Sequence, residues 1–122
     1  KNVISTTEAP GAIGPYSQGI DLGNIVFALA RYLSTPLRAD AGGHNRPDRT
    51  GDSNVKALLK SIGLGLENVV KTTVFLADIA DFAAMNEVYA SHFAEPYPAR
   101  SAVAVKDLPK GAMVEVEVIA AR

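Results

Sequence analysis

The chain has 122 residues, a hydrophobic fraction of 48%, charged residues at 20% and a formal net charge of −1. These values fit one compact domain with a real core, and they lack the basic excess of a dedicated nucleic-acid binder. The absence of cysteine excludes disulfides, a thiol nucleophile and a cysteine-based metal site, and His44 and His92 cannot form a zinc site by themselves. No apolar stretch approaches the roughly 20 residues of a membrane span. The N-terminal residues show no signal-peptide pattern, so we expect a cytoplasmic protein without a cofactor.

The N-terminal quarter predicts three strands. Residues 2–5 form a short edge strand, and residues 6–16, which are rich in proline and glycine, form a loop held by turn chemistry. Residues 18–22 and 25–30 then read as two strands around Gly23-Asn24, a pair that favours a tight hairpin.

The middle of the chain predicts an amphipathic helix. Apolar residues fall at i, i+3, i+4 and i+7, which places them on one helical face: Val55, Leu58, Leu59 and Ile62. Asp52 or Ser53 is expected to cap the start of this helix, and Gly63 to end it.

The second half predicts a strand, a helix and two further strands. Residues 69–77 are rich in β-formers, and Asp78 is expected to cap a second helix that reaches about Phe93. The buried stripe of that helix is predicted to comprise Ile79, Phe82, Met85, Tyr89 and Phe93. Proline residues stop the helix, and residues 100–105 and 113–120 form the last strands.

This order, β-β-β-α-β-α-β-β, predicts one α+β domain with a mixed sheet and two helices on one face. The other face of the sheet is then bare. Alternation assigns Ser101, Val103 and the valines of the last strand to the helix side. Arg100, Ala102, Ala104, Glu115 and Glu117 are thereby predicted to lie on the bare face. Small alanines among charged residues suit close approach by another chain, which predicts an oligomer.

Seven segments together resemble the RidA (YjgF, endoribonuclease L-PSP-like) family. They are residues 12–18 (AIGPYSQ), 70–75 (VKTTVF), 81–83 (DFA), 86–89 (NEVY), 98–101 (PARS), 108–112 (LPKGA) and 114–117 (VEVE). Their joint order and spacing span the single domain 1–122, apart from residues 28–53. The resemblance implies a chorismate-mutase-like fold and a homotrimer with its sheets facing inward and its sites at subunit interfaces.

Residues 28–53 diverge from that family. The family usually reads Thr-Ser-Gly-Gln-Ile-Pro-Leu-Asp-Pro-x-Thr-Gly, where residues 28–39 of this chain read ALARYLSTPLRA. These twelve residues can be back-translated into a DNA string that, in a shifted frame, encodes Ser-Gly-Gln-Ile-Pro-Leu-Asp-Pro-Ala-Thr-Gly. Our hypothesis is a frameshifted reading that is restored near Asn54. The mass of the intact protein distinguishes the two readings.

Arg100 and Glu115 are the predicted catalytic pair. A guanidinium is a planar fork that suits a carboxylate, and the family Arg matching Arg100 binds the substrate carboxylate. A carboxylate in a partly closed seam can act as a general base, and the resemblance gives that role to Glu115 and not to Glu117. Without the resemblance, an ion pair between subunits is the favoured explanation of Arg100 and explains Glu115 about equally well.

The resemblance also implies a set of substrate-binding residues: Tyr16, Ala30, Asn86, Arg100, Ser101 and Ala102. From the residues alone, Tyr16 could equally be a half-buried interface tyrosine, whereas Asn86 is better explained as a helix-surface residue. Ala30 occupies the position of a family glycine that lets backbone approach a ligand. Ala102 replaces a frequent family cysteine, which argues against thiol chemistry.

The implied reaction is hydrolysis of a 2-imino acid, or its enamine tautomer, to a 2-oxo acid and ammonia. Neither metal nor organic cofactor is expected, because an imine is already electrophilic. A small 2-imino or 2-oxo acid is the expected ligand, and neither membrane nor nucleic acid is an expected partner. Two alternatives stay open: an endoribonuclease or translation inhibitor, and a non-catalytic sensor of small carboxylates.

Overall fold

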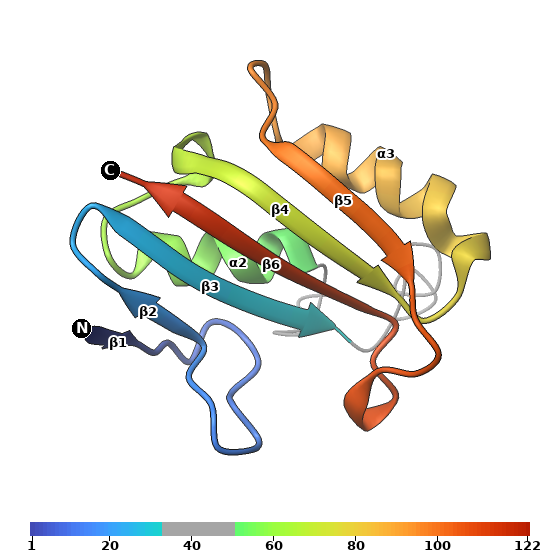
Figure 1. The fold of residues 1–122 in the computed structure, drawn as a ribbon, viewed down its shortest axis with the longest axis horizontal. Helices are drawn as coiled ribbons and strands as arrows, with labels where there is room; N and C mark the ends of the chain where they lie inside the picture. The colour runs from blue at the N-terminus through green and yellow to red at the C-terminus, as the bar shows by residue number, and fades with distance from the viewer. Residues whose placement is uncertain (33–50) are drawn as a thin grey trace.

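The computed structural model describes residues 1–32 and 51–122, and shows one six-stranded sheet in the order β1-β2-β3-β6-β4-β5. The helices α2 (Gly51–Lys60) and α3 (Phe82–His92) lie behind it in Figure 1. The strands are β1 (Asn2–Ile4), β2 (Gly19–Asp21), β3 (Ile25–Tyr32), β4 (Val69–Leu76), β5 (Ala99–Ala104) and β6 (Val114–Ala121). The predicted α+β order and the mixed sheet are therefore confirmed. Only the β4 and β5 pair is parallel among the described strands.

The hydrophobic core lies between the sheet and the two helices. β3, β6 and β4 alternate buried and more exposed residues, because successive side chains of a strand point to opposite faces. The buried sets are Val26, Ala28 and Ala30 on β3, Val114, Val116 and Val118 on β6, and Thr72, Val74 and Leu76 on β4. They meet Val55, Leu58 and Leu59 of α2 and Met85 and Tyr89 of α3. Within the described part, no helix has the length and apolarity to cross a bilayer.

Helix α2 begins earlier than predicted and ends where predicted. Asp52 and Ser53 lie inside Gly51–Lys60, so the prediction that either caps its start is wrong. At the other end, Leu64 N–H donates to the Leu59 carbonyl at 2.9 Å and Gly63 N–H to the Lys60 carbonyl at 3.0 Å. Gly63 itself has φ +79°. This paired pattern is a Schellman motif, which needs the left-handed backbone that glycine adopts without strain.

We expect Gly63→Ala to lower the free energy of unfolding by about 1 kcal/mol, because alanine is strained at this φ. An added Cβ at Gly63 meets no heavy atom within 4 Å, so crowding does not contribute. Gly11 is a matched control, since its Cβ position is also open and its φ lies outside the left-handed region. Urea unfolding at fixed protein concentration measures both variants, and equal losses at the two sites would contradict the explanation.

Helix α3 begins after a separate turn. Asp78 caps a 3₁₀ turn, Ile79–Asp81, by accepting a hydrogen bond from Ala80 N–H at 2.9 Å, so it does not cap the helix directly. The helical spacing therefore does not extend back to Ile79, which is 60% exposed and not part of the buried stripe as predicted. Met85, Tyr89 and Phe93 are buried, as expected.

The sheet face without described helices, here called the open face, faces the viewer in Figure 1. Cross-strand partners share a face, so one open-face row holds Leu29, Glu117, Thr73 and Ser101, and the next holds Glu115, Phe75 and Val103. Phe27 and Val103 on this face are 44% and 46% exposed. Such exposed apolar residues are typical of a surface that packs against another chain.

The predicted faces of β5 are wrong, while those of β6 are confirmed. Val114, Val116 and Val118 are buried under the helices, and Glu115 and Glu117 lie on the open face. On β5, however, Arg100 pairs with Thr72 and Ala102 with Val74, and both partners are fully buried on the helix side. Arg100, Ala102 and Ala104 therefore lie on the helix side, and Ser101 and Val103 on the open face.

Most of the divergent segment, residues 33–50, lies outside the described residues. Its described beginning continues β3 as far as Tyr32, two residues beyond the predicted strand end at Ala30. The hypothesis of a frameshifted reading stays a prediction.

Candidate functional site

Arg100 lies on β5, an edge strand that runs beside helix α3 in Figure 1. It ends a helix-side row that runs through Ala28, Val118 and Thr72, all of which are buried. Because no described strand lies beyond β5, the row opens to the outside at Arg100. The side chain is half-buried, so its stem packs on the protein while its charged end stays accessible.

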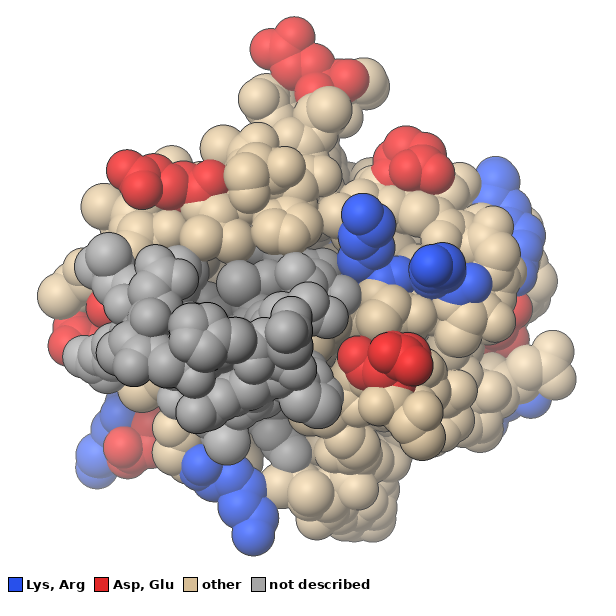
Figure 2. Space-filling model, turned by 180° about the vertical axis from the view of Figure 1, so that it is seen from behind, with Lys and Arg blue, Asp and Glu red and all other residues tan. Residues whose placement is uncertain are grey.

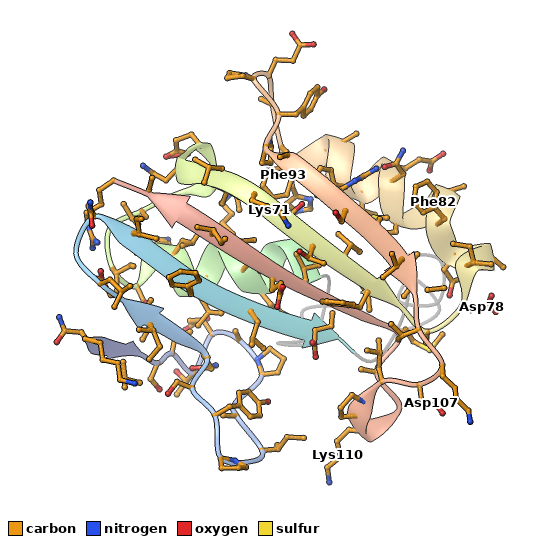
Figure 3. The ribbon with its side chains drawn as sticks, in the orientation of Figure 1. Lys71, Asp78, Phe82, Phe93, Asp107 and Lys110 are labelled. Atoms are coloured by element: carbon orange, nitrogen blue, oxygen red, sulfur yellow. The ribbon has the colours of Figure 1, made fainter. Side chains whose placement is uncertain are left out.

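The guanidinium of Arg100 is held by three side chains of α3. Its Nη1 donates a hydrogen bond to Asn86 Oδ1 at 2.7 Å. Its central carbon lies 4.7 Å from the centroid of the Tyr89 ring and 5.8 Å from that of Phe82, within the range of cation–π attraction. Figure 3 labels Phe82 at the end of α3 where the helix starts. Asn86 lies about one turn after Phe82 and about one turn before Tyr89, so all three lie on one face of the helix.

Tyr89 is itself fixed in place. Its hydroxyl shares a hydrogen bond of 2.9 Å with the Thr72 hydroxyl, and both residues are buried. The ring also stacks on Phe93, with centroids 4.4 Å apart. A buried hydroxyl pair of this kind holds its ring firmly, because breaking it leaves a polar group without a partner.

Arg100 has no carboxylate partner among the described residues, whereas Arg122 does. Arg122 donates from Nη1 and Nη2 to the two carboxylate oxygens of Asp21, at 2.8 and 3.1 Å. That hydrogen bonding holds the pKa of Asp21 below its ordinary value, and raises the pKa of Arg122. The Asp21–Arg122 pair is therefore an example, in the same chain, of a guanidinium that already binds a carboxylate. The Nε and Nη2 donors of Arg100 contact no acceptor in the described part of the chain.

The structure separates the predicted catalytic pair within one chain. Arg100 lies on the helix side of the sheet and Glu115 on the open face, so the two groups do not share a cleft. The prediction that both project from the bare face is therefore wrong for Arg100. Glu115 lies in the same row as Phe75 and Val103, two β-strands away from β5 in the sheet order.

The remaining predicted site residues fall in four places. Asn86 contacts Arg100, and Ala102 lies on the same helix-side face of β5, partly buried against the core. Ser101 lies on the open face. Tyr16 is 38% exposed in the loop before β2, towards the opposite edge of the sheet, and Ala30 is buried in the core beneath α2. One chain therefore brings together only Arg100, Asn86 and Ala102.

Three residues around Arg100 were not predicted as site residues: Thr72, Phe82 and Tyr89. The sequence places Phe82 and Tyr89 on the inner stripe of α3, where they read as ordinary core. The sequence signal that could have identified them is the size of the side chains, because bulky aromatic rings on a helix need small residues on the facing strand. Ala102, which packs against the core, is such a small residue.

A hollow of about 330 Å³ lies on the open face, and its lining includes Phe27, Lys71, Thr73, Glu117 and Ile119. Lys71 is labelled on β4 in Figure 3, and its Nζ lies 3.3 Å from Thr73 Oγ1. Neither Arg100 nor Glu115 lines this hollow. Across the described residues there is no group of three His, Cys, Asp or Glu side chains that could hold a metal ion.

The comparisons with known proteins agree on one family. The model of the endoribonuclease L-PSP family matches residues 6–122. A human protein named 2-iminobutanoate/2-iminopropanoate deaminase is 41% identical over 122 residues, covering 98% of this chain and 89% of its own. The crystal structure of RidA from an Antarctic Psychrobacter superposes with a TM-score of 0.82 at 38% identity, with both chains covered completely. The crystal structure of Escherichia coli TdcF with bound serine has a TM-score of 0.78 at 39% identity and covers 100% and 99% of the two chains.

Proposed function

The chain belongs to the endoribonuclease L-PSP family, which includes the RidA proteins, and we propose that it hydrolyses 2-imino acids and their enamine tautomers to 2-oxo acids and ammonia. The observation that carries the proposal is the unoccupied fork of Arg100. The guanidinium is oriented by Asn86 and Tyr89, and no described carboxylate neutralises it. A relative that is named a deaminase of 2-imino acids, and another that was solved with a bound amino acid, support a small carboxylate as its ligand.

Arg100 would bind the substrate carboxylate through its Nε and Nη2 edge. Two parallel charge-assisted hydrogen bonds fix both the position and the plane of a carboxylate. The imine carbon is bonded directly to that carboxylate, so its place is fixed as well. Orientation of this kind contributes to the rate because the attacking water then meets a carbon held in one geometry.

Glu115 would act as the general base, supplied by a neighbouring copy of the chain. Water adds to the imine carbon while Glu115 takes one of its protons and passes it to nitrogen, which gives a carbinolamine. The hydroxyl proton then moves through the same carboxylate to nitrogen as the carbon–nitrogen bond breaks. The products are the 2-oxo acid and ammonia, so atoms and charge balance without an oxidant or reductant.

A neighbouring copy is needed because Glu115 and Arg100 of one chain lie on opposite faces of the sheet. We propose the homotrimer that the family resemblance implies, with the open face of one copy packed beside the β5 edge of the next. The exposed Phe27 and Val103 on the open face are then covered. In this arrangement the neighbouring copy, whose open face lies beside Arg100, would supply the other substrate-binding residues. These are Tyr16, Ser101 and the backbone of Ala30.

Ribonuclease activity, the other activity carried by the family name, is less well supported by the charges. RNA binding needs clustered cations for the phosphates. In Figure 2 the described part of the helix side shows Lys and Arg scattered among Asp and Glu. Location in the cytoplasm stays a prediction.

An imine-trapping assay tests the proposal. An amino acid oxidase generates 2-iminobutanoate in the cuvette, and we expect the purified protein to accelerate release of 2-oxobutanoate over the uncatalysed rate. A chain that binds 2-oxobutanoate but gives no acceleration would be a carboxylate sensor instead. RNA cleavage that survives Arg100→Ala, with no effect on the imine, would favour the ribonuclease.

A further inference from the structure

We propose that Tyr89 is a positioning residue, whose ring face holds the Arg100 guanidinium in the orientation that receives the substrate carboxylate. This inference rests on the proposed function, because it assumes that Arg100 binds the carboxylate. It assigns a role to a buried aromatic residue that otherwise reads as part of the hydrophobic core.

The geometry of the guanidinium supports this role. A cation over a ring face is attracted by the ring electrons, and its N–H donors, which lie in the guanidinium plane, stay available. The Tyr89 centroid is 4.7 Å from the central guanidinium carbon of Arg100, closer than the Phe82 centroid at 5.8 Å. Asn86 takes one Nη1 donor, at 2.7 Å. Ring and amide together restrain the guanidinium and leave the Nε and Nη2 edge for the ligand.

The hydroxyl of Tyr89 connects this support to the sheet. It is hydrogen-bonded to Thr72, and Thr72 is the cross-strand partner of Arg100 in the parallel β4 and β5 pair. The residue that anchors the ring therefore lies beside the residue that the ring supports. Phe93, which directly follows α3 and stacks on Tyr89 at 4.4 Å, also restrains the ring. A ring fixed in this way limits the motion of a side chain that otherwise has many rotamers.

The test measures binding of 2-oxobutanoate and of the uncharged 2-oxobutanamide by titration calorimetry. We expect Tyr89→Leu to weaken 2-oxobutanoate about 10-fold, the size of a partly desolvated cation–π contact. Binding of the amide, which does not use the guanidinium charge, should be unchanged. Tyr89→Phe combined with Thr72→Val keeps the ring but removes its hydroxyl anchor, so its loss of carboxylate affinity should be smaller than that of Tyr89→Leu. A role in packing alone would weaken both ligands equally.

Several results would overturn the inference: wild-type affinity for 2-oxobutanoate in Tyr89→Leu, equal losses for both ligands, or no binding of 2-oxobutanoate by the unaltered chain. Turnover is measured separately. If Tyr89→Leu binds 2-oxobutanoate about 10-fold more weakly but the unaltered chain does not hydrolyse the imine, only the deaminase function is rejected. If the unaltered chain hydrolyses the imine but Tyr89→Leu binds 2-oxobutanoate normally, only this inference is rejected. If Tyr89→Leu does not fold, NMR of the unaltered chain decides, because the Arg100 Nε proton should be shifted upfield by the ring. A random-coil shift would contradict the proposal.

Discussion

Replacement of Arg100 by alanine will lower kcat/KM for 2-iminobutanoate by about 100-fold or more. The variant loses two charge-assisted hydrogen bonds to the substrate carboxylate, each of which contributes roughly 1.5 kcal/mol or more. Folding should change little, because Arg100 is half-buried and forms one hydrogen bond, with Asn86, within the described part of the chain. Steady-state rates across a range of imine concentrations, with the oligomer size measured by light scattering, give both quantities.

Two further variants make this result specific. Arg100→Lys keeps the charge but not the planar fork, so its loss should be intermediate. Arg122→Ala removes another arginine, whose fork is already occupied by Asp21, and it should leave kcat/KM unchanged. Full activity in Arg100→Ala, or an equal loss in Arg122→Ala, would refute the assignment of the carboxylate site.

Replacement of Glu115 by glutamine will lower kcat by about 100-fold or more, the usual effect of removing a positioned general base. The KM should change little, since the amide has the same shape and the substrate carboxylate is bound elsewhere. Pre-steady-state and steady-state rates at a fixed pH separate the two effects.

Glu117→Gln is the matched control for this variant. Glu117 lies on the same strand and the same open face, two residues further along, and it is exposed. Its replacement should leave kcat within about 3-fold of the wild type, because Glu117 has no part in the proposed proton transfer. A large loss in Glu117→Gln with normal turnover in Glu115→Gln would exchange the roles of the two carboxylates.

Periodicity predicted the elements of this fold well, because most of its buried residues repeat with the spacing of one helix or strand. The burial of the β6 valines and of Leu58 and Leu59 on α2 follows directly from the spacing of apolar residues in the sequence. The start of α3 was missed because a 3₁₀ turn intervenes, and a helical stripe cannot show where the spacing changes. Such a boundary depends on local backbone geometry around Asp78 and not on apolar spacing.

The faces of β5 were misjudged for a different reason. Valines were assigned to the core and an arginine among alanines to the bare face, which is the common arrangement. At this edge strand the facing helix carries aromatic rings, so small residues fit beneath them and the guanidinium lies on the rings. The side chains of β5 do alternate between the two faces of the sheet. The pairing of Arg100 with the buried Thr72 is what assigns Arg100 to the helix side. Sequence alone does not supply that pairing.

This correction changes the proposed site and is the reason why we propose a neighbouring copy. With Arg100 and Glu115 on opposite faces of one sheet, no single chain can apply both groups to one substrate. The family resemblance chose the residues, and we propose that they meet between two copies of the chain. The central claim is therefore that each site takes its arginine from one chain and its glutamate from another.

Mixing two inactive variants tests that claim most directly. Arg100→Ala and Glu115→Gln chains are unfolded together in equal amounts and refolded, so that mixed oligomers form. Sites that pair the intact arginine of one chain with the intact glutamate of the next should then appear, and random mixing predicts roughly one quarter of the wild-type activity. Activity no higher than that of the separately refolded variants would contradict the shared site.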